Sequence, residues 1–424
     1  MTGPAASAAR GAVPWLVISG VLVAALSLRG PIIAPTPVLR DIQDDLGIGA
    51  ASAGLLTTVP ILTFAVLTPV AALVIRRAGA ELALLLTLIG VVLGTLVRAI
   101  PGFGWMLAGS LVIGAAITIG NVVVPVIIRR DVPPRQVSAV TAAYVSMLNA
   151  GSLLTALATA PLAAALGWPL ALLTWIVVSL AGIVLWVVHL RRARGADAYS
   201  GEPTVVTGSA AARTAPDISA LTGPLPVAGG RRRGILRRPI VWLLALTFAC
   251  QAAMYYGLTT WLPTILGDDL GVDRTTAGTM ASLFHGVAIV GAFVVPLLAR
   301  RFAPLVPALV ICACWLILTA GMLFAPAHYI VWATFGAVAH SGGFVVIFST
   351  LVAVARSDGE AAGMSAFVQG AGYGVAALAA PAMGALHELN DGWTGALVLL
   401  LALSIAYGVL MLAAMLRLPS GRRA

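Results

Sequence analysis

The feature that most constrains this chain is a series of twelve apolar runs, each about 20 residues or longer, separated by short polar segments. A helix of about 20 apolar residues crosses the roughly 30 Å hydrocarbon core of a bilayer, whereas barrel strands need only about 10. With 9% charged residues, the chain could not cover the surface of a water-soluble domain. The pattern predicts an all-α membrane protein and excludes a cytosolic enzyme, a secreted module and a disordered protein. The predicted spans are 14–37, 50–75, 81–99, 105–128, 137–166, 169–190, 239–263, 274–299, 304–325, 329–355, 361–386 and 393–416.

The two halves of the chain repeat one another. The sequence DDLG occurs at 44–47 and again at 268–271, and at the same spacing Arg76-Arg77 recurs as Arg300-Arg301. Both copies therefore enter the membrane in the same orientation. This repeat predicts two pseudo-symmetric six-helix bundles related by an axis along the membrane normal, with a central site between them.

One long polar stretch separates the halves. Residues 191–238 are rich in Gly, Ala, Ser, Thr, Pro and Arg, which predicts a flexible linker between a bundle at 1–190 and a bundle at 239–424. The linker shares its side of the membrane with both termini. All but four of the 25 arginines fall on that side, and most of the loop aspartates fall on the other. The positive-inside rule then predicts cytoplasmic termini in a cytoplasmic (inner) membrane.

Polar side chains inside the apolar runs are costly, so each is a candidate site residue. No Asp or Glu lies inside a run away from its ends, so a buried carboxylate cannot be the proton carrier. Arg29 lies about 15 residues into the first run, roughly 22 Å along a helix. Its guanidinium could snorkel to the outer headgroups, or it could bind an anion in a central cavity. The adjacent Gly30-Pro31 suits backbone approach to a ligand and favours the second reading.

Two histidines lie near the midplane. His285 and His340 are each about 11 residues from the outer end of their runs, roughly 16 Å deep. They are candidates for substrate binding and proton coupling, because imidazole changes charge near neutral pH; the alternative is hydrogen bonding between helices. The other candidate substrate-binding residues are Asn121, Asn149, Gln251, Tyr255, Gln369 and Tyr373. For the amides the alternative is again interhelical hydrogen bonding.

Further polar residues near span ends have simpler interpretations. We expect Arg98, at the outer end of the third run, to be an interface anchor. The interfacial aromatic belt is the alternative for Tyr255 and suits Trp261 better. The three cysteines fall inside apolar runs, which argues against a disulfide framework or a zinc site.

Four segments carry a family resemblance: SLRGP at 27–31, AGLLTTVP at 53–60, GNVVVP at 120–125 followed by RRD, and LGW at 166–168. They resemble the cyanate/2-nitroimidazole transporter family of the major facilitator superfamily, and the superfamily resemblance covers nearly the whole chain. It implies a major facilitator fold with the third, sixth, ninth and twelfth spans at the periphery. It also implies transport of a small polar or anionic solute. The loop after span 2 keeps Arg77 and Gly79 of the superfamily pattern but has Arg76 where the usual latch has an Asp.

These observations predict a secondary active transporter in which two bundles rock around a small anionic or compact polar solute, held near the midplane between Arg29, His285 and His340. Proton coupling through a histidine is a further hypothesis. The candidate gating and bending residues are Arg76, Arg77, Arg300, Arg301, Pro161 and Pro381.

The same reading predicts a monomer in contact with membrane lipid, without cofactor, metal, nucleic-acid partner or enzymatic activity. A chain without Lys has no P-loop, so ATP drive within this polypeptide is excluded. One alternative is a multidrug or antibiotic efflux transporter, which predicts an apolar cavity and a tolerant Arg29. A second is a membrane sensor or binding protein that no longer transports, although the short C-terminal tail argues against it.

Overall fold

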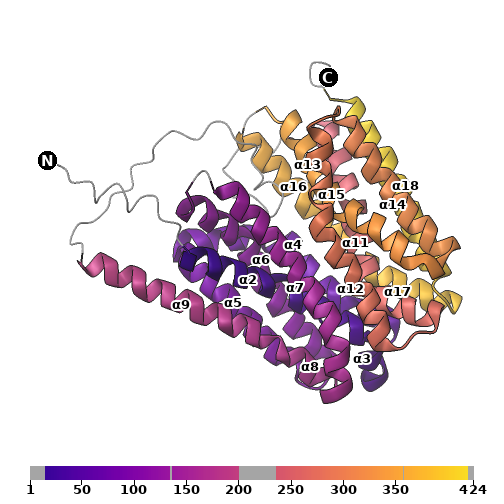
Figure 1. Cartoon of the computed structure of the whole chain (residues 1–424), viewed down its shortest axis with the longest axis horizontal. Helices are drawn as coiled ribbons and strands as arrows, with labels where there is room; N and C mark the ends of the chain where they lie inside the picture. Colours follow the sequence, from indigo (N-terminus) through magenta and orange to yellow (C-terminus); the bar gives the residue numbers. More distant parts are fainter. Residues whose placement is uncertain (1–14, 134–135, 200–234, 357, 419–424) are drawn as a thin grey trace.

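The computed structural model describes residues 15–133, 136–199, 235–356 and 358–418, and the regular elements in these ranges are helices (Figure 1). The first half contains α2 (Trp15–Ile33), η2 (Thr36–Val38), α3 (Leu39–Leu46), α4 (Ala50–Ala78), α5 (Ala80–Arg98), α6 (Phe103–Asp131), α7 (Val137–Leu166), α8 (Trp168–Thr174) and α9 (Ile176–Tyr199). The second half contains α11 (Pro239–Leu270), α12 (Arg274–Gly291), α13 (Val294–Ala299), α14 (Leu305–Phe324), η4 (Pro326–His328), α15 (Tyr329–Val354), α16 (Asp358–Ala376), α17 (Ala379–Asn390) and α18 (Thr394–Leu416).

Twelve helical segments in this part of the chain are long and apolar enough to cross a membrane, which confirms the predicted number of spans. Two predicted ends were too early. Helix α11 continues through Pro263 to Leu270, and α9 continues to Tyr199, into the predicted linker. Membrane helices tolerate an internal proline where neighbouring groups satisfy the freed backbone. The remainder of the linker, apart from its last residues 235–238, lies outside the described residues.

The repeated DDLG sequence has a structural explanation. Its glycines, Gly47 and Gly271, both have φ near +60° and close the C-termini of α3 and α11 in the left-handed conformation that glycine adopts without strain. Directly after the second copy, Asp273 caps α12 by accepting hydrogen bonds from the backbone N–H groups of Thr275 and Thr276. We call the end of the molecule that carries these aspartates the acidic end. The opposite end, which carries Arg76 and Arg300, is the arginine-rich end.

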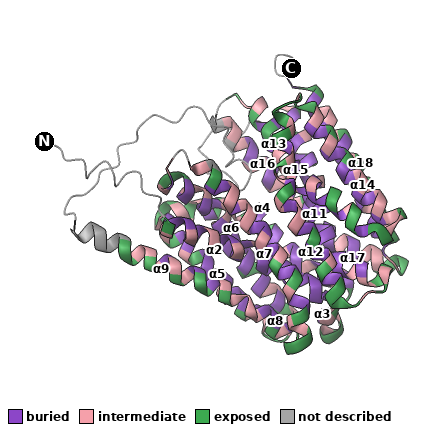
Figure 2. Cartoon of the chain, viewed as in Figure 1, coloured by how far each residue is buried: buried purple, intermediate pink, exposed green. Residues whose placement is uncertain are grey.

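The larger apolar core combines the second half with first-half residues near the acidic end, such as Val38, Ile42 and Leu56, and the buried residues of a second core all come from the first half. The helices expected at the periphery make their main contacts within their own half. Helix α5 packs on α6 and α9, while α14 and α18 pack on each other and on α15 and α11. Residues exposed on α9, α14 and α18 lie on the outward side of the molecule, whereas α11 is buried along most of its length (Figure 2). The halves meet where α7 packs on α12 and where α4 packs on α16 and α17.

At the acidic end the two halves are in direct contact through small residues. A Cβ atom added at Gly54 of α4 would lie 2.8 Å from the carbonyl carbon of Ala380 in α17. One added at Gly384 would lie 2.6 Å from the carbonyl carbon of Ala50. Backbones this close exclude water and larger side chains. We call the contact of α4 with α17 and of α7 with α12 the seam.

Polar contacts between other helix pairs also join the halves at the acidic end. Arg40 forms an ion pair with Asp268 at 2.6 Å, and Arg274 pairs with Asp41. Deeper in the membrane, the hydroxyls of Thr57 and Thr260 lie 2.8 Å apart. The acidic end is therefore closed by both packing and polar contacts.

Candidate functional site

The centre of the molecule holds an arginine that bridges the two halves. Arg29 lies on α2, which continues as a helix through Gly30 and Pro31 to Ile33. Its Nη1 atom donates a hydrogen bond to the hydroxyl of Tyr255 on α11 at 2.9 Å, and its guanidinium carbon lies 5.4 Å from the centre of that ring. No ion pair joins Arg29 to an Asp or Glu within the described ranges. The site therefore presents a positive charge without a protein counter-charge.

Aromatic rings surround this cation. The ring of Tyr255 stacks on the imidazole of His340, with centroids 3.7 Å apart and planes within 9°. Tyr256 contacts Tyr255 edge to face, and Tyr373 packs against both Tyr256 and Phe64. These rings form a rigid, apolar wall with hydroxyl groups, which suits a compact solute that needs both shape and polar contacts.

A cavity of about 30 Å³ adjoins the guanidinium. Its lining residues come from both halves and are Leu28, Arg29, Ile32, Ile33, Phe64, Ile117, Asn121, Leu148, Tyr255, Tyr256 and Tyr373. One water molecule needs about 10–15 Å³ measured in this way, so the space as it stands holds only a few heavy atoms. Of the predicted site residues, the structure brings Arg29, Asn121, Tyr255 and Tyr373 together around this cavity.

The two histidines lie behind the cavity wall. His285 of α12 and His340 of α15 are 3% and 4% exposed, and the Nδ1 atom of each has no hydrogen-bond partner in the described part of the chain. The ring of Tyr255 contacts both, edge-on to His285 and stacked on His340. The imidazoles therefore do not line the cavity themselves; they contact Tyr255, which does.

The remaining amides differ from Asn121 in their surroundings. Gln251 is fully buried and uses both ends of its amide within the second half: Nε2 donates to the carbonyl of His340, and Oε1 accepts from the indole of Trp315. Gln369 donates to the hydroxyl of Ser365 on its own helix, and Asn149 is 7% exposed on α7. Gln251 thus holds α11, α14 and α15 together, the alternative role considered for the amides.

The candidate gating residues lie at two levels. Arg76, Arg77, Arg300 and Arg301 are exposed at the arginine-rich end. Helix α7 continues through Pro161 without interruption. The helical conformation is interrupted between α16 and α17, just before Pro381. Pro381 cannot donate to the carbonyl of Ala377, and the hydroxyl of Thr58 in the other half fills that position at 2.6 Å.

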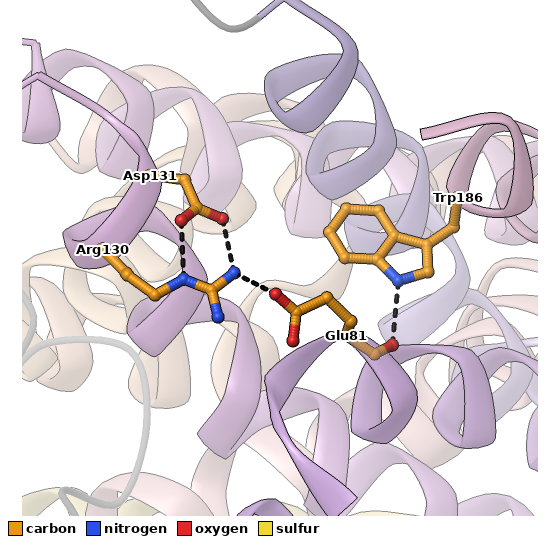
Figure 3. A network of polar contacts seen from close by, with 4 residues as sticks. All are labelled: Glu81, Arg130, Asp131 and Trp186. Atoms are coloured by element: carbon orange, nitrogen blue, oxygen red, sulfur yellow. Dashed lines mark hydrogen bonds and ion pairs between the residues drawn. The ribbon is translucent and has the colours of Figure 1, made fainter. Parts of the chain in front are cut away.

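An ion-pair network joins helix ends within the first half despite the arginine at position 76. Arg130, at the end of α6, pairs with Glu81 at the start of α5 and with its neighbour Asp131 (Figure 3). The indole of Trp186 on α9 donates to the backbone carbonyl of Glu81 at 2.9 Å. The network ties three helices of the first half together, α5, α6 and α9.

Two expectations for the helix ends were wrong. Arg98 is 2% exposed and donates to the carbonyl of Pro31 on α2, so it is buried between helices and is no interface anchor. Trp261 is fully buried and donates to the carbonyl of Ala380, so it packs at the seam and not in an aromatic belt. In both cases the polar group is buried and donates to a backbone carbonyl of another helix, and this contact takes the place of one with the headgroups.

Sequence reasoning missed Phe64 and Tyr144. Phe64 and Tyr256 line the cavity. Tyr144 on α7 is fully buried, and its hydroxyl has no hydrogen-bond partner among the described residues. A buried hydroxyl without a partner is uncommon and marks a place where a ligand or water can bind. The signal in the sequence was the presence of tyrosines well inside spans.

Comparison with known proteins gives three findings. The model of the Major Facilitator Superfamily matches residues 17–381. The 2-nitroimidazole transporter of Escherichia coli (strain K12) is 30% identical over 406 residues, which cover 94% of this chain and 95% of that protein. The cyanate transport protein CynX of the same organism is 21% identical over 373 residues, covering 87% and 89%.

A solved structure shares the fold. The bacterial homologue of the human lysosomal transporter Spinster, in an inward-facing and unoccupied conformation, superposes with a TM-score of 0.66. It is 16% identical, and the match covers 95% of this chain and 96% of that one. At this identity the likeness concerns the fold alone.

Proposed function

Because the chain belongs to the Major Facilitator Superfamily and is a transporter related to the 2-nitroimidazole and cyanate transporters, we propose that it moves a small anionic or compact polar solute by alternating access, with Arg29 as the primary contact. It is a multi-pass membrane protein with twelve spans and not an enzyme. The observation that carries the proposal is the central guanidinium without a protein counter-charge.

Electrostatics supports an anion or a strongly polarised group as the solute. A buried charge without a partner is costly in a medium of low dielectric constant, and a bound anion offsets that cost. Guanidinium presents a planar set of donors, of which one nitrogen is occupied by Tyr255. The other donors can bind a carboxylate-like or nitro-like group. Asn121 on the cavity wall can donate a further hydrogen bond.

The size of the cavity supports a compact solute. A space of about 30 Å³ accommodates a triatomic ion such as cyanate more readily than a substituted imidazole. A larger solute would have to move the rings of Tyr256 and Tyr373 or separate the two halves. Cyanate and 2-nitroimidazole, which the names of the two relatives supply, are therefore the first probes to compare.

We further propose that the arginine-rich end faces the cytoplasm, together with both termini, and that the transporter acts as a monomer in a bacterial inner membrane. The arginine distribution supports this orientation, since the segments that the sequence assigns to the cytoplasmic side hold 21 of the 25 arginines. The closed acidic end then faces outward. Arg76, Arg77, Arg300 and Arg301 are proposed to act in the opposite, cytoplasmic closure, and Pro161 and Pro381 as bending points.

Proton coupling through His285 and His340 is proposed on the same electrostatic ground. Both imidazoles contact the ring of Tyr255, whose hydroxyl accepts a hydrogen bond from Arg29, so a protonated imidazole would lie near a second positive charge and be repelled by it. A bound anion would offset that repulsion, so anion and proton would favour each other's binding, and such coupling is reciprocal. The double variant His285→Gln, His340→Gln should lose the pH dependence of uptake. If it kept the full pH dependence, these histidines would not be the coupling groups.

The proposal is tested by uptake into proteoliposomes. Arg29→Met should lower the uptake of [14C]cyanate by about 100-fold, equivalent to roughly 2.7 kcal/mol, as expected for the loss of charge-assisted hydrogen bonds. Arg40→Met, which removes an exposed arginine of the acidic end, is the matched control and should change uptake less than about threefold. Unchanged transport by Arg29→Met would support export of hydrophobic drugs instead. Absence of flux for every probe in the parent protein would favour a sensor.

A further inference from the structure

The buried side chain of Arg98 donates its hydrogen bond to a backbone carbonyl of another helix. Arg98 is the last residue of α5 and is 2% exposed, and its Nη1 atom donates to the carbonyl oxygen of Pro31 on α2 at 2.6 Å. Its Nε and Nη2 atoms are buried and have no partner among the described residues. Keeping a buried guanidinium with two free nitrogens is costly, and an apolar residue would avoid that cost. The contact with Pro31 is therefore the feature to explain.

The sequence of α2 explains why this carbonyl needs an outside donor. In a helix the carbonyl of residue 31 accepts from the N–H of residue 35, but residue 35 is a proline. Pro35 has helical dihedral angles, φ −66° and ψ −26°, so its nitrogen stands where the donor would be but carries no hydrogen. The carbonyl of Ile33 is orphaned in the same way by Pro37, and the hydroxyl of Thr36 fills that place at 2.9 Å. The carbonyl of Ile33 thus accepts from a side chain three residues away, whereas the carbonyl of Pro31 accepts from Arg98 on α5.

The orphaned carbonyl lies two residues from the central cation. Pro31 itself cannot donate to the carbonyl of Ser27, so the turn that carries Arg29 lacks main-chain hydrogen bonds on both sides. Gly30 in this turn is packed tightly, since a Cβ there would lie 2.8 Å from the hydroxyl of Thr155. A small change in the direction of α2 would move the guanidinium of Arg29 away from Tyr255.

We propose that Arg98 is a positioning residue for transport: it ties the proline-interrupted end of α2 to α5 and so holds Arg29 against Tyr255 and the cavity. The inference rests on the proposed function, in which Arg29 contacts the solute. Arg98 itself lines no part of the central cavity.

The test uses compensation at Pro35. Arg98→Met removes the donor while keeping an unbranched apolar side chain, and it should raise the KM for [14C]cyanate uptake by about tenfold with Vmax changed less than about twofold. Pro35→Ala supplies a backbone N–H that can reach the carbonyl of Pro31, so the double variant Arg98→Met, Pro35→Ala should recover most of the affinity. Thr36→Val leaves the carbonyl of Ile33 unpartnered and is the matched control; it should lower thermal stability without changing KM.

Structures of the variants separate this inference from the proposed function. In Arg98→Met the hydrogen bond between Arg29 and Tyr255 should be lost, and in the double variant it should be present. If that bond persists in Arg98→Met, or if Pro35→Ala fails to restore it, the positioning role is wrong whatever the transport rates are. If the bond responds as expected but Arg29→Met transports cyanate normally, the positioning role stands and the proposed solute site is wrong. Should Arg98→Met alone fail to fold, folding and transport by the double variant would support the inference, and failure of both variants would overturn it.

Discussion

Closure of the acidic end should depend on the absence of one methyl group. In the seam, a Cβ at position 54 would lie 2.8 Å from the carbonyl carbon of Ala380 and 2.8 Å from the nitrogen of Pro381. Both are backbone atoms and cannot rotate away. Since carbon atoms in contact prefer about 3.5 Å or more, Gly54→Ala must separate α4 and α17 by roughly 0.7 Å. Overpacking of this kind costs about 1–3 kcal/mol, which shifts the ratio of closed to open molecules by roughly 5- to 150-fold.

The internal repeat supplies the matched control. Gly278 is the counterpart of Gly54 in the second half and lies in the contact of α12 with α7. A Cβ at position 278 would lie 3.4 Å from the carbonyl oxygen of Ala156 and 3.5 Å from the Cβ of Ala160. These distances are ordinary contacts. Gly278→Ala should therefore change the closed-to-open ratio by no more than about twofold.

Distances between spin labels would measure this equilibrium. Labels at Asp44 and Leu389, whose side chains are 71% and 80% exposed, lie in the two halves at the acidic end. The three native cysteines, Cys250, Cys312 and Cys314, are free and would first be replaced by serine or alanine. In lipid nanodiscs, Gly54→Ala should populate a longer distance that Gly278→Ala does not. Equal distributions for both variants, or a larger change for Gly278→Ala, would refute the packing argument.

Three further outcomes follow from the polar contacts. Burial acts to raise the pKa of Glu360, but hydrogen bonds from the Arg356 backbone and from Arg238 outweigh it and lower that pKa below its ordinary value. The contribution of the Glu360 carboxylate to stability is therefore present above about pH 4.3 and lost as pH falls through the lowered pKa. The difference in melting temperature between the parent protein and Glu360→Gln should accordingly shrink in acid. The ion pair of Arg40 with Asp268 is half-exposed, so a double-mutant cycle on stability should give a coupling of at most about 1 kcal/mol that salt reduces; a larger, salt-insensitive value would contradict this. Trp186→Phe removes the hydrogen bond to the start of α5 and should destabilise the protein by about 1 kcal/mol in denaturant unfolding, whereas no change would mean that the bond contributes nothing.

The sequence indicated how far along its span each polar side chain lies, but not toward which neighbour that side chain points. Counting residues placed Gln251 and His340 near the middle of their spans and Arg29 between the middle and the outer end; Gln251 and His340 are buried, and Arg29 lines the central cavity. Their environments nevertheless differ: Arg29 borders the cavity, while Gln251 is enclosed by Trp315 and the backbone of His340. Because these helices are apolar on nearly every side, no polar stripe marks which face meets lipid, a neighbouring helix or the cavity.

The number of spans, the repeat and the family followed from the sequence alone, because the thickness of the bilayer and the need to satisfy every backbone group act along a single helix. The tertiary structure decided which polar groups meet. Arg98 was expected at the membrane surface, but it is buried and donates to the carbonyl of Pro31 on α2. That carbonyl has no main-chain donor because residue 35 is a proline. The seam likewise depends on how closely the backbones of α4 and α17 approach, which no single helix contains. Contacts between helices are set by packing of the whole bundle, and their residues lie far apart in the chain.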